Sequence, residues 1–371
     1  MVQPEVGELE KGGLGEAAAL LARRARGSGP ASLPPFSPAS TTWASTAVGA
    51  SVPLTGRYSG QGVQMRAGLE LWAERSGARL ILADDSSRPE EAVRLYGLLR
   101  EGCRLVLGPY GSDSTRAVAQ AGFPGLLWNH GAAADDVQLL PGVVSVPSPA
   151  SRYLVALGLT VAVLRPGASV VAVTGEGRFA RLAREGLERA VAGLGLELAA
   201  SFTLADAPVA IADAKPDAVL LCGPAQHEVP LLRALAQLLP DALLGGVSPA
   251  LAAFPDLLGQ DPEGFLAPAQ WHASLGTSPQ LGPSSAEVLA DARSRGLGPL
   301  DYVAAQAYAC ALVAERCLEL SPDDPEAAAR ALRTNTFFGA FELDETGLQR
   351  GHRMCVVRWR RGRQQLLFAG L

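Results

Sequence analysis

Several features that would assign the chain to a common class are missing from its sequence. No run of 18 apolar residues occurs, so no helix is expected to span a membrane. The five cysteines are an odd number in a chain of 371 residues, and they form no CxxC pair or Cys/His cluster. This argues against a disulfide scaffold and a zinc site. With a formal net charge of −5, the chain also lacks the basic character of a nucleic-acid binder.

Motifs of phosphate and nucleophile chemistry are missing as well. The segment GPYGSDST at 108–115 has no lysine, as a phosphate-binding Walker loop requires, and no GxGxxG follows the first predicted strand. The same segment does not match the GxSxG elbow of serine hydrolases. His130 with Asp135 and Asp136 has poor spacing for a metal site. We therefore predict no enzyme, no cofactor and no metal.

The first 45 residues differ from the rest of the chain. A short apolar run at 17–22 precedes a basic cluster at 23–26, which is the reverse of the order in a secretory signal. Residues 28–46 are rich in Ser, Pro, Ala and Thr, a composition typical of linkers. We expect residues 1–45 to form a flexible segment. No signal peptide is visible, so the pattern leaves an exported and a cytoplasmic chain both open.

From residue 46 onward, strand-like and helix-like segments alternate. Strands are predicted at 47–54, 80–83, 104–107 and 126–128, with helices at 63–75, 89–100 and 112–121. After a crossover at 145–152 the alternation restarts, with strands at 169–174, 197–203, 217–222 and 243–247 and helices at 181–194 and 229–238. Such alternation is typical of parallel sheets that are covered on both faces, so the predicted fold class is α/β.

The end of the chain has a different pattern. The segment 302–318 is apolar almost all round and predicts a buried helix. Asp344 to Gly347 predict the turn of an antiparallel hairpin, and a basic run near the terminus reads as its solvated face. Four of the five cysteines have apolar neighbours and should be buried. His227, His272 and His352 are expected at the surface.

The corner after strand 104–107 is the first candidate site. Ligands of open parallel sheets bind beyond the carboxyl ends of the strands. Here a helix amino terminus, with its free N–H groups and partial positive charge, coincides with the hydroxyls of Ser112, Ser114 and Thr115. This combination favours a small anion such as a carboxylate. The alternative is that the hydroxyls only cap the helix.

The order of the segments resembles one protein family. The chain is similar to the type I periplasmic solute-binding proteins, in the branch of the leucine/isoleucine/valine-binding proteins. Eight segments between 47 and about 347 carry the resemblance: VGASVPLTGRYSGQGVQMRAGLEL (48–71), ADDSSRPEEAV (83–93), RLVLGPYGSDSTRAVA (104–119), PGLLWNHGAAADD (124–136), PDAVLLCGPAQHEVPLLRAL (216–235), DPEGFLA (261–267), YVAAQAYACALVAERCL (302–318) and FFGAFELDETG (337–347).

The resemblance implies an architecture. Two doubly wound parallel-sheet lobes would be joined by three crossover strands and close on a ligand like a Venus flytrap. We expect one lobe from 46–148 plus 272–338 and the other from 149–271 plus 339–371. The chain would be an extracytoplasmic, monomeric binding protein that delivers its ligand to the permease of an ABC importer. The alternative is an intracellular ligand-sensing regulator of the same fold.

The resemblance also implies a ligand site. His130 is added to this site because it lies at a predicted strand tip near the mouth of the cleft. Ser112, with Gly111, would hold the carboxylate of the ligand, Ala132 would offer backbone groups, and Tyr58 would cover the site. Phe179 matches a tyrosine of the second lobe. The predicted site comprises Tyr58, Tyr110, Gly111, Ser112, Ser114, Thr115, His130, Ala132, Ala134, Glu176 and Phe179.

The chain departs from the family pattern at two places. Ala134 lacks the expected hydroxyl, and no acid occurs near Val247 and Ser248, where the ammonium of an amino acid would be met. Either another acidic residue binds the ammonium group, or the ligand has no ammonium group. The candidates for such an acidic residue are Asp113, Glu176 and Glu228. Carboxylate capture is therefore better supported than amino-acid capture. Trp128 and Phe179 are either an apolar wall of the site or core residues.

Overall fold

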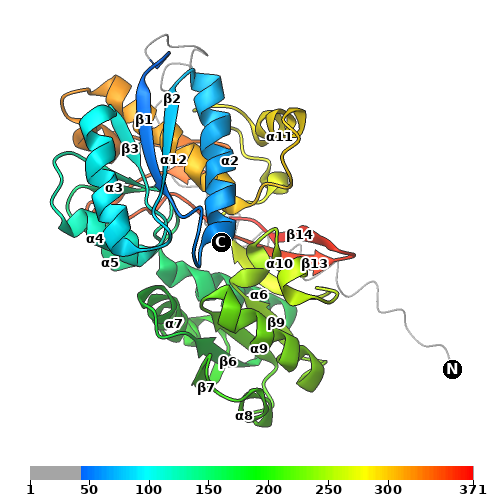
Figure 1. Cartoon of the computed structure of the whole chain (residues 1–371). Helices are drawn as coiled ribbons and strands as arrows, with labels where there is room; N and C mark the ends of the chain where they lie inside the picture. The colour runs from blue at the N-terminus through cyan, green and yellow to red at the C-terminus, as the bar shows by residue number, and fades with distance from the viewer. Residues whose placement is uncertain (1–42, 371) are drawn as a thin grey trace.

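Two α/β lobes make up the part of the chain that the structure describes. The computed structural model describes residues 43–370. The lobes lie one above the other in Figure 1, and each is built round its own sheet. The first sheet has the strand order β2-β1-β3-β4-β5, and the second has the order β14-β13-β10-β9-β8-β6-β7. The predicted α/β fold with two parallel-sheet lobes is confirmed.

The first lobe contains a fully parallel sheet. Its strands are β1 (Ala47–Val52), β2 (Arg79–Asp84), β3 (Leu105–Leu107), β4 (Leu127–Asn129) and β5 (Val143–Ser145). Its helices are α2 (Ser59–Ser76), α3 (Pro89–Gly102), α4 (Ser112–Gln120), α5 (Asp135–Gln138), α11 (Ser285–Ser294), α12 (Tyr302–Leu320) and α13 (Pro325–Ala331). The last three come from the later part of the chain, so this lobe is assembled discontinuously, as the resemblance implied.

The second lobe contains a mixed sheet. The parallel strands are β6 (Ser169–Thr174), β7 (Glu197–Thr203), β8 (Ala218–Cys222), β9 (Leu243–Gly246) and β10 (Leu266–Ala269). An antiparallel hairpin of β13 (Cys355–Arg360) and β14 (Arg363–Phe368) extends it. The helices are α6 (Tyr153–Leu164), α7 (Arg178–Ala190), α8 (Pro208–Asp213), α9 (Ala225–Leu238) and α10 (Phe254–Leu258). A short ribbon pairs β11 (Thr334–Asn335) with β12 (Ala340–Phe341).

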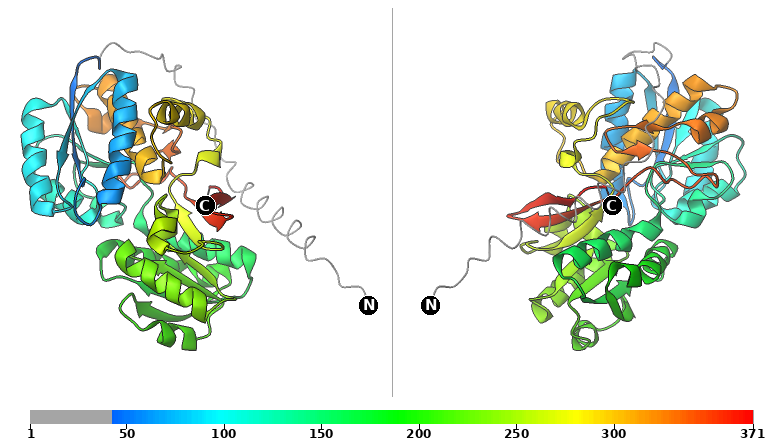
Figure 2. Two further views of the ribbon diagram at one scale, coloured as in Figure 1. Left: turned by 45° about the vertical axis from the view of Figure 1, so that its right-hand side comes forward. Right: turned by 180° about the vertical axis from the view of Figure 1, so that it is seen from behind.

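Three segments of the chain pass between the lobes, and their side chains are tied together. They are the segments after β5, after β10 and before β13, and Figure 2 shows them meeting at the waist of the molecule. The amide of Ser148 donates to Oε1 of Gln270 at 2.9 Å, and the Ser148 hydroxyl donates to the carbonyl of His352 at 2.9 Å. All three residues are fully buried. One side chain from each crossing segment therefore joins a single hydrogen-bonded junction.

Several sequence predictions need correction. His352 is buried at this junction and is not at the surface, because Ser148 and the ring of Phe338 cover it. Asp344 to Gly347 do form a turn, and Leu343 pairs antiparallel with Gln349 across it, but the long hairpin turns at Arg361 and Gly362. Trp43 lies inside the segment predicted as a tether, yet it is fully buried and packs edge-on against Trp72. Otherwise the prediction for 1–45 lies outside the described residues.

Other predictions are confirmed. Helix α12 is buried along most of its length, and Cys222, Cys310, Cys317 and Cys355 are buried, as their neighbours indicated. None of the described helices combines the length and the apolar character that crossing a membrane requires. The division into lobes at the residue boundaries given above stays a prediction.

Candidate functional site

The corner after β3 presents unpaired backbone donors. The chain turns through Gly108–Pro109, and Gly111 precedes helix α4 with a φ of 90°, a conformation that glycine adopts without strain. The amides of Ser112, Asp113 and Ser114 form the first turn of the helix, where no intrahelical carbonyl is available. They make no hydrogen bond with any described residue. The corner therefore offers three N–H donors at the positive end of a helix dipole.

The three hydroxyls of this corner differ in availability. Thr115 is fully buried, and its hydroxyl donates to the carbonyl of Gly111 at 2.9 Å. Ser114 is buried too. Ser112 is half-buried, and its Oγ lies 3.4 Å from the amide nitrogen of Ala134, which donates to it. Ser112 is thus the hydroxyl best placed for a ligand. The hydroxyl of Thr115 is used internally, and no side chain caps the amino terminus of helix α4, contrary to the capping alternative.

The tip of strand β4 is fixed by a buried asparagine that sequence reasoning missed. The side-chain amide of Asn129 donates to the carbonyl of Ala132 and to Oγ of Ser145, both at 2.8 Å. Its Oδ1 accepts from the amides of Gly131 and Ala132. Ala132 and Ala134 are consequently held in a small apolar cluster and are fully buried. The only signal in the sequence was an asparagine that ends an apolar strand.

His130 follows Asn129 at the same tip. Its side chain is fully buried, and neither ring nitrogen has a hydrogen-bond partner among the described residues. Burial lowers the pKa of His130 to about 4, so the imidazole is neutral near pH 7. Its Nε2 lies 3.1 Å from the place where a Cβ on Gly108 would stand. A neutral imidazole offers one donor and one acceptor, both unused here.

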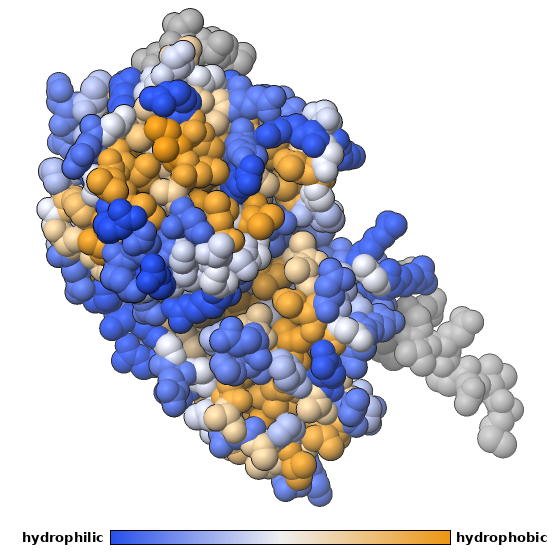
Figure 3. All heavy atoms as spheres, viewed as in Figure 1, coloured by the Kyte–Doolittle hydropathy of each residue, from blue (hydrophilic) through white to orange (hydrophobic). Residues whose placement is uncertain are grey.

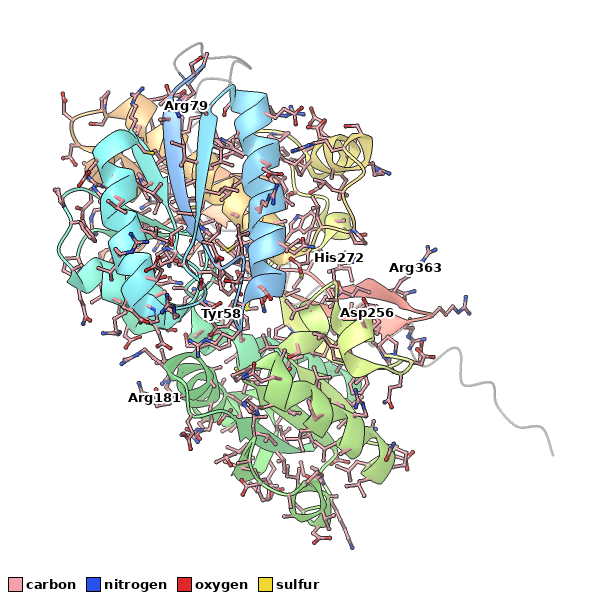
Figure 4. All side chains as sticks on the ribbon, in the orientation of Figure 1. Tyr58, Arg79, Arg181, Asp256, His272 and Arg363 are labelled. Atoms are coloured by element: carbon pink, nitrogen blue, oxygen red, sulfur yellow. The ribbon has the colours of Figure 1, made fainter. Side chains whose placement is uncertain are left out.

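An aromatic cover lies over the corner. A Cβ on Gly111 would stand 3.2 Å from Cε2 of Tyr58, so the tyrosine ring rests on the glycine. Tyr58 packs edge-on against Tyr110, with ring centroids 5.4 Å apart. The guanidinium of Arg57 lies 4.7 Å above the Tyr58 ring and 3.4 Å from Asp113. Figure 4 shows Tyr58 at the end of the first lobe that faces the second, where a cover of the site was predicted.

The second lobe contributes its own aromatic pair. Phe179 of helix α7 is half-buried and packs edge-on against Tyr153 at a centroid distance of 4.9 Å. Glu176 is exposed in the loop before this helix. Trp128 is buried in the core of the first lobe, which fits the core alternative for that residue. Of the two proposed wall residues, Phe179 is therefore the better placed.

An ion-pair bridge joins the lobes beside the corner. Asp136 of helix α5 binds Arg116 of helix α4 at 2.7 Å, and it also binds Arg178, the first residue of helix α7 in the second lobe. All three side chains are about one-quarter to one-third exposed. Figure 3 shows hydrophilic residues along the rim of the first lobe at the waist. The bridge holds the carboxyl edges of the two sheets against each other.

A phenol and carboxylate cluster completes the interface, and sequence reasoning missed it. The phenols of Tyr110 and Tyr302 are neighbours, and burial raises the pKa of both. Asp301 caps helix α12 by accepting from the amide of Val303 at 2.8 Å, and it also accepts from the amide of Ala252 in the second lobe at 3.4 Å. Burial raises the pKa of Asp301 to about 6. An aspartate directly before an apolar helix was the available signal.

The three acidic residues that could bind an ammonium group are either paired with other groups of the protein or exposed. Glu228 is fully buried and accepts from the amides of Gly223 and Ser248 at 3.0 and 2.6 Å. Burial raises its pKa to about 7. Asp113 pairs with Arg57, and Glu176 is exposed. Glu228 thus fastens two loops of its own lobe, and it does so at Ser248, where the ammonium-binding acid was expected.

Two further observations delimit the site. Among residues 43–370, no three His, Cys, Asp or Glu side chains are grouped closely enough to hold a metal ion. Cavities of about 260 and 310 Å³ lie beside the crossing segments, and neither is lined by a residue of the 111–115 corner. The corner itself is covered by Tyr58 and the second lobe.

The sequence matches a family profile over most of its length. The family is described as "Periplasmic binding protein", and the match covers residues 45–364. No curated protein sequence matches the chain significantly.

Solved structures share the fold at low sequence identity. A leucine-binding protein from Thermotoga maritima is 17% identical, with a TM-score of 0.75 over 86% of this chain and 97% of that one. A solute-binding protein of an ABC transporter from R. palustris, in complex with benzoate, is 18% identical, with a TM-score of 0.72 over 87% and 96%. A branched-chain amino acid binding protein from Streptococcus pneumoniae, in complex with isoleucine, is 14% identical, with a TM-score of 0.72 over 87% and 99%.

Proposed function

Because the chain belongs to the periplasmic binding protein family, we propose that it captures a small carboxylate between its lobes and delivers it to an ABC importer. It acts outside the cytoplasmic membrane as a binding protein and performs no chemistry on its ligand. Closure of the lobes buries the ligand, and the differential affinity of the ligand for the closed form drives the closure.

One observation carries the proposal. Three unpaired amides and the half-buried hydroxyl of Ser112 converge at the positive end of helix α4. A carboxylate is the ligand group that such donors suit, since each charge-assisted hydrogen bond is shorter and stronger than a neutral one. Tyr58 lies over the same spot, and Phe179 extends from the opposite lobe. The ligand carboxylate would displace part of this cover.

The surroundings favour a ligand without an ammonium group. Ala134 offers no hydroxyl, and the amide of Ser248 is already paired with Glu228. Aromatic rings from both lobes and a neutral, unpaired imidazole at His130 are the remaining side chains. We propose an aromatic or aliphatic carboxylate, a class that includes the benzoate bound by one structural neighbour.

The first test is a binding measurement with a matched variant. Benzoate, 4-hydroxybenzoate, leucine and isoleucine would be screened by thermal shift and quantified by calorimetry. We expect a benzoate to bind more tightly than either amino acid. Ser112→Ala should weaken the best ligand at least tenfold, as expected for one hydrogen bond to a charged group at about 1.5–3 kcal/mol.

Ser201→Ala is the control, because Ser201 is exposed on strand β7 in the second lobe. It should leave the affinity unchanged. Equal affinities of Ser112→Ala and the unmodified protein would reject the assigned site, and turnover of a bound compound would reject the binding-protein role. Uptake of the labelled ligand by cells with and without the chain tests delivery to an importer.

A further inference from the structure

A second cavity lies on the crossing segments, away from the corner at 111–115. It has a volume of about 310 Å³, at the lower end of the range for small-molecule pockets. One wall is the face of helix α6 formed by Val155, Ala156 and Leu159. The other wall comes from the segment that leads into strand β13, which Figure 2 shows passing close to helix α6. Arginines supply all the charged groups of the lining, namely Arg152, Arg350 and Arg353.

The positive charge of this cavity is only partly compensated. Arg350 pairs with Glu342 across its outer edge. Within the described part of the chain, Arg152 and Arg353 form no ion pair with a carboxylate. Arg353 contacts only the carbonyl of Gly370, at 3.3 Å. Two arginines without a carboxylate partner therefore face one cavity.

Arg152 is the more buried of the two. Its Nη1 donates to the carbonyl of His352 at 2.9 Å and to that of Arg350 at 3.3 Å, while its other N–H groups have no partner among the described residues. Burial lowers the pKa of Arg152, the charge of Asp135 opposes this shift, and the charge of Arg353 adds to it. A guanidinium nevertheless stays charged in proteins. Desolvation without a counter-ion is unfavourable, so an anion in the cavity would stabilise this arrangement.

The nearest acids are engaged in other contacts. Asp135 accepts from the amide and hydroxyl of Ser151 at 3.0 and 2.6 Å. Asp344 accepts from the amide and hydroxyl of Thr346 within its own turn. Neither carboxylate lies within 4.0 Å of Arg152. At longer range the charges of Asp135 and Asp344 still favour the charged form of Arg152, but neither acid forms a direct ion pair with it.

We propose that this cavity binds a small organic monocarboxylate, with its carboxylate between Arg152 and Arg353 and its apolar body on helix α6. Two guanidinium groups suit a carboxylate because their N–H donors match its two oxygens. The three apolar side chains suit a short aliphatic or aromatic body. The site is distinct from the cleft and does not depend on the proposed transport function.

The location gives the bound anion a mechanical consequence. Arg152 belongs to the crossing segment after β5, whereas Arg353 belongs to the one before β13, and His352 lies between them in the buried junction. An anion held by both arginines therefore links two of the three crossing segments. Its affinity should differ between lobe arrangements, and by reciprocity it should shift the affinity of the cleft for its own ligand.

The test separates this cavity from the cleft. Calorimetry with benzoate and hexanoate on the Ser112→Ala protein, whose cleft is weakened, should show a site that benzamide does not occupy. In that background Arg353→Gln should weaken binding at least tenfold, the loss expected for one charged contact. Arg152→Gln should also weaken binding at least tenfold. Arg353→Gln is the decisive variant, because the Arg353 side chain is exposed and its replacement should not affect folding. The control is Arg363→Gln on the exposed tip of the hairpin, labelled in Figure 4, which should bind as before.

A crystal soaked with 4-bromobenzoate should show an anomalous bromine signal against helix α6. The proposal would be overturned if neither benzoate nor hexanoate bound at concentrations up to about 10 mM, well above a millimolar dissociation constant. It would also be overturned if Arg353→Gln and Arg363→Gln bound these ligands equally well, or if the bromine signal appeared only between the lobes. The last result would leave the cleft proposal intact. A bromine signal against helix α6 with none in the cleft would support the cavity and count against the cleft.

Discussion

Burial decides the charge of His130, and its charge affects stability. The ring is fully enclosed, neither nitrogen is paired, and burial lowers its pKa to about 4 from an ordinary value near 6.5. Between these two pH values the unfolded chain binds a proton at this position and the folded chain does not. The free energy of unfolding contributed by His130 therefore falls as the pH falls from 6.5 to 4.

His130→Leu should remove this dependence. We expect the variant to gain stability relative to the unmodified protein as the pH is lowered, by about 3 kcal/mol at pH 4. Urea unfolding at several pH values measures the difference in the free energy of unfolding between the variant and the unmodified protein. The contributions of the other titrating groups cancel in this difference because both proteins contain them. His227→Leu replaces an exposed histidine by the same residue and is the control for the substitution itself. A constant difference for His130→Leu would mean that the pKa of the ring is the same in the folded and the unfolded chain.

Sequence reasoning located some residues of the site better than others. The contact between Tyr58 and Gly111 could be anticipated, because a motif fixes both positions along the chain. The environment of His130 could not, since its burial depends on contacts between separate strands, such as the close approach of Gly108 to its ring. The same holds for His352, whose partner Ser148 is distant in sequence. Pairings between separate crossing segments leave no local pattern.

At the scale of elements, helices α2 and α12 pack closely against each other in the first lobe. A Cβ on Gly68 would stand 2.1 Å from the backbone carbonyl oxygen of Ala304, so the glycine lets the two helices approach. Beside it the indole of Trp72 donates to Glu315 at 3.1 Å. Burial raises the pKa of Glu315 to about 7, which fits a carboxyl enclosed between the helices.

Gly68→Ala should force the helices apart. Since the obstructing atom is backbone, we expect a loss of about 1–3 kcal/mol or more in the free energy of unfolding. Gly60→Ala lies in the same helix with no atom near its Cβ, and it should be neutral or gain up to about 1 kcal/mol. Chemical denaturation measures both. Equal stabilities of the two variants would show that the helices do not touch as described.

The elements that were predicted well carry their own local signal. Strands β6 and β7 were placed at their observed bounds, because short apolar or alternating runs are flanked by polar turns. Helix α6 was missed because Tyr153 to Leu164 are apolar on nearly every side and show no stripe. Strand β10 was missed because Pro268 interrupts its apolar run, and a proline argues against a central strand. Its pairing with β13 is a long-range contact.

At the scale of the whole molecule, the interlobe bridge of Asp136 with Arg116 and Arg178 contributes to closure. Its side chains are partly exposed, so the contribution is modest, at about 1 kcal/mol or less. The junction of Ser148, Gln270 and His352 is fully buried and joins the three crossing segments independently of the bridge. The bridge can therefore open while the junction stays intact.

Asp136→Asn should shift the lobes toward the open arrangement. We expect a larger radius of gyration in small-angle X-ray scattering, with an equilibrium shift of less than about tenfold. Added salt should bring the unmodified protein toward the variant, because ions screen partly exposed pairs. Asp256→Asn is the control, because Asp256 is an exposed residue of helix α10. This variant should scatter like the unmodified protein. Identical scattering of all three proteins at low salt would exclude a role of the bridge in closure.

The position of helix α12 also matters during synthesis. The first lobe buries this helix, yet the ribosome produces its sheet long before residues 302–320 emerge. At about 5–20 residues per second, the nascent sheet waits on the order of tens of seconds with an apolar face uncovered. The amino-terminal half of the chain should therefore need a chaperone to keep that face from aggregating until the ribosome has nearly finished.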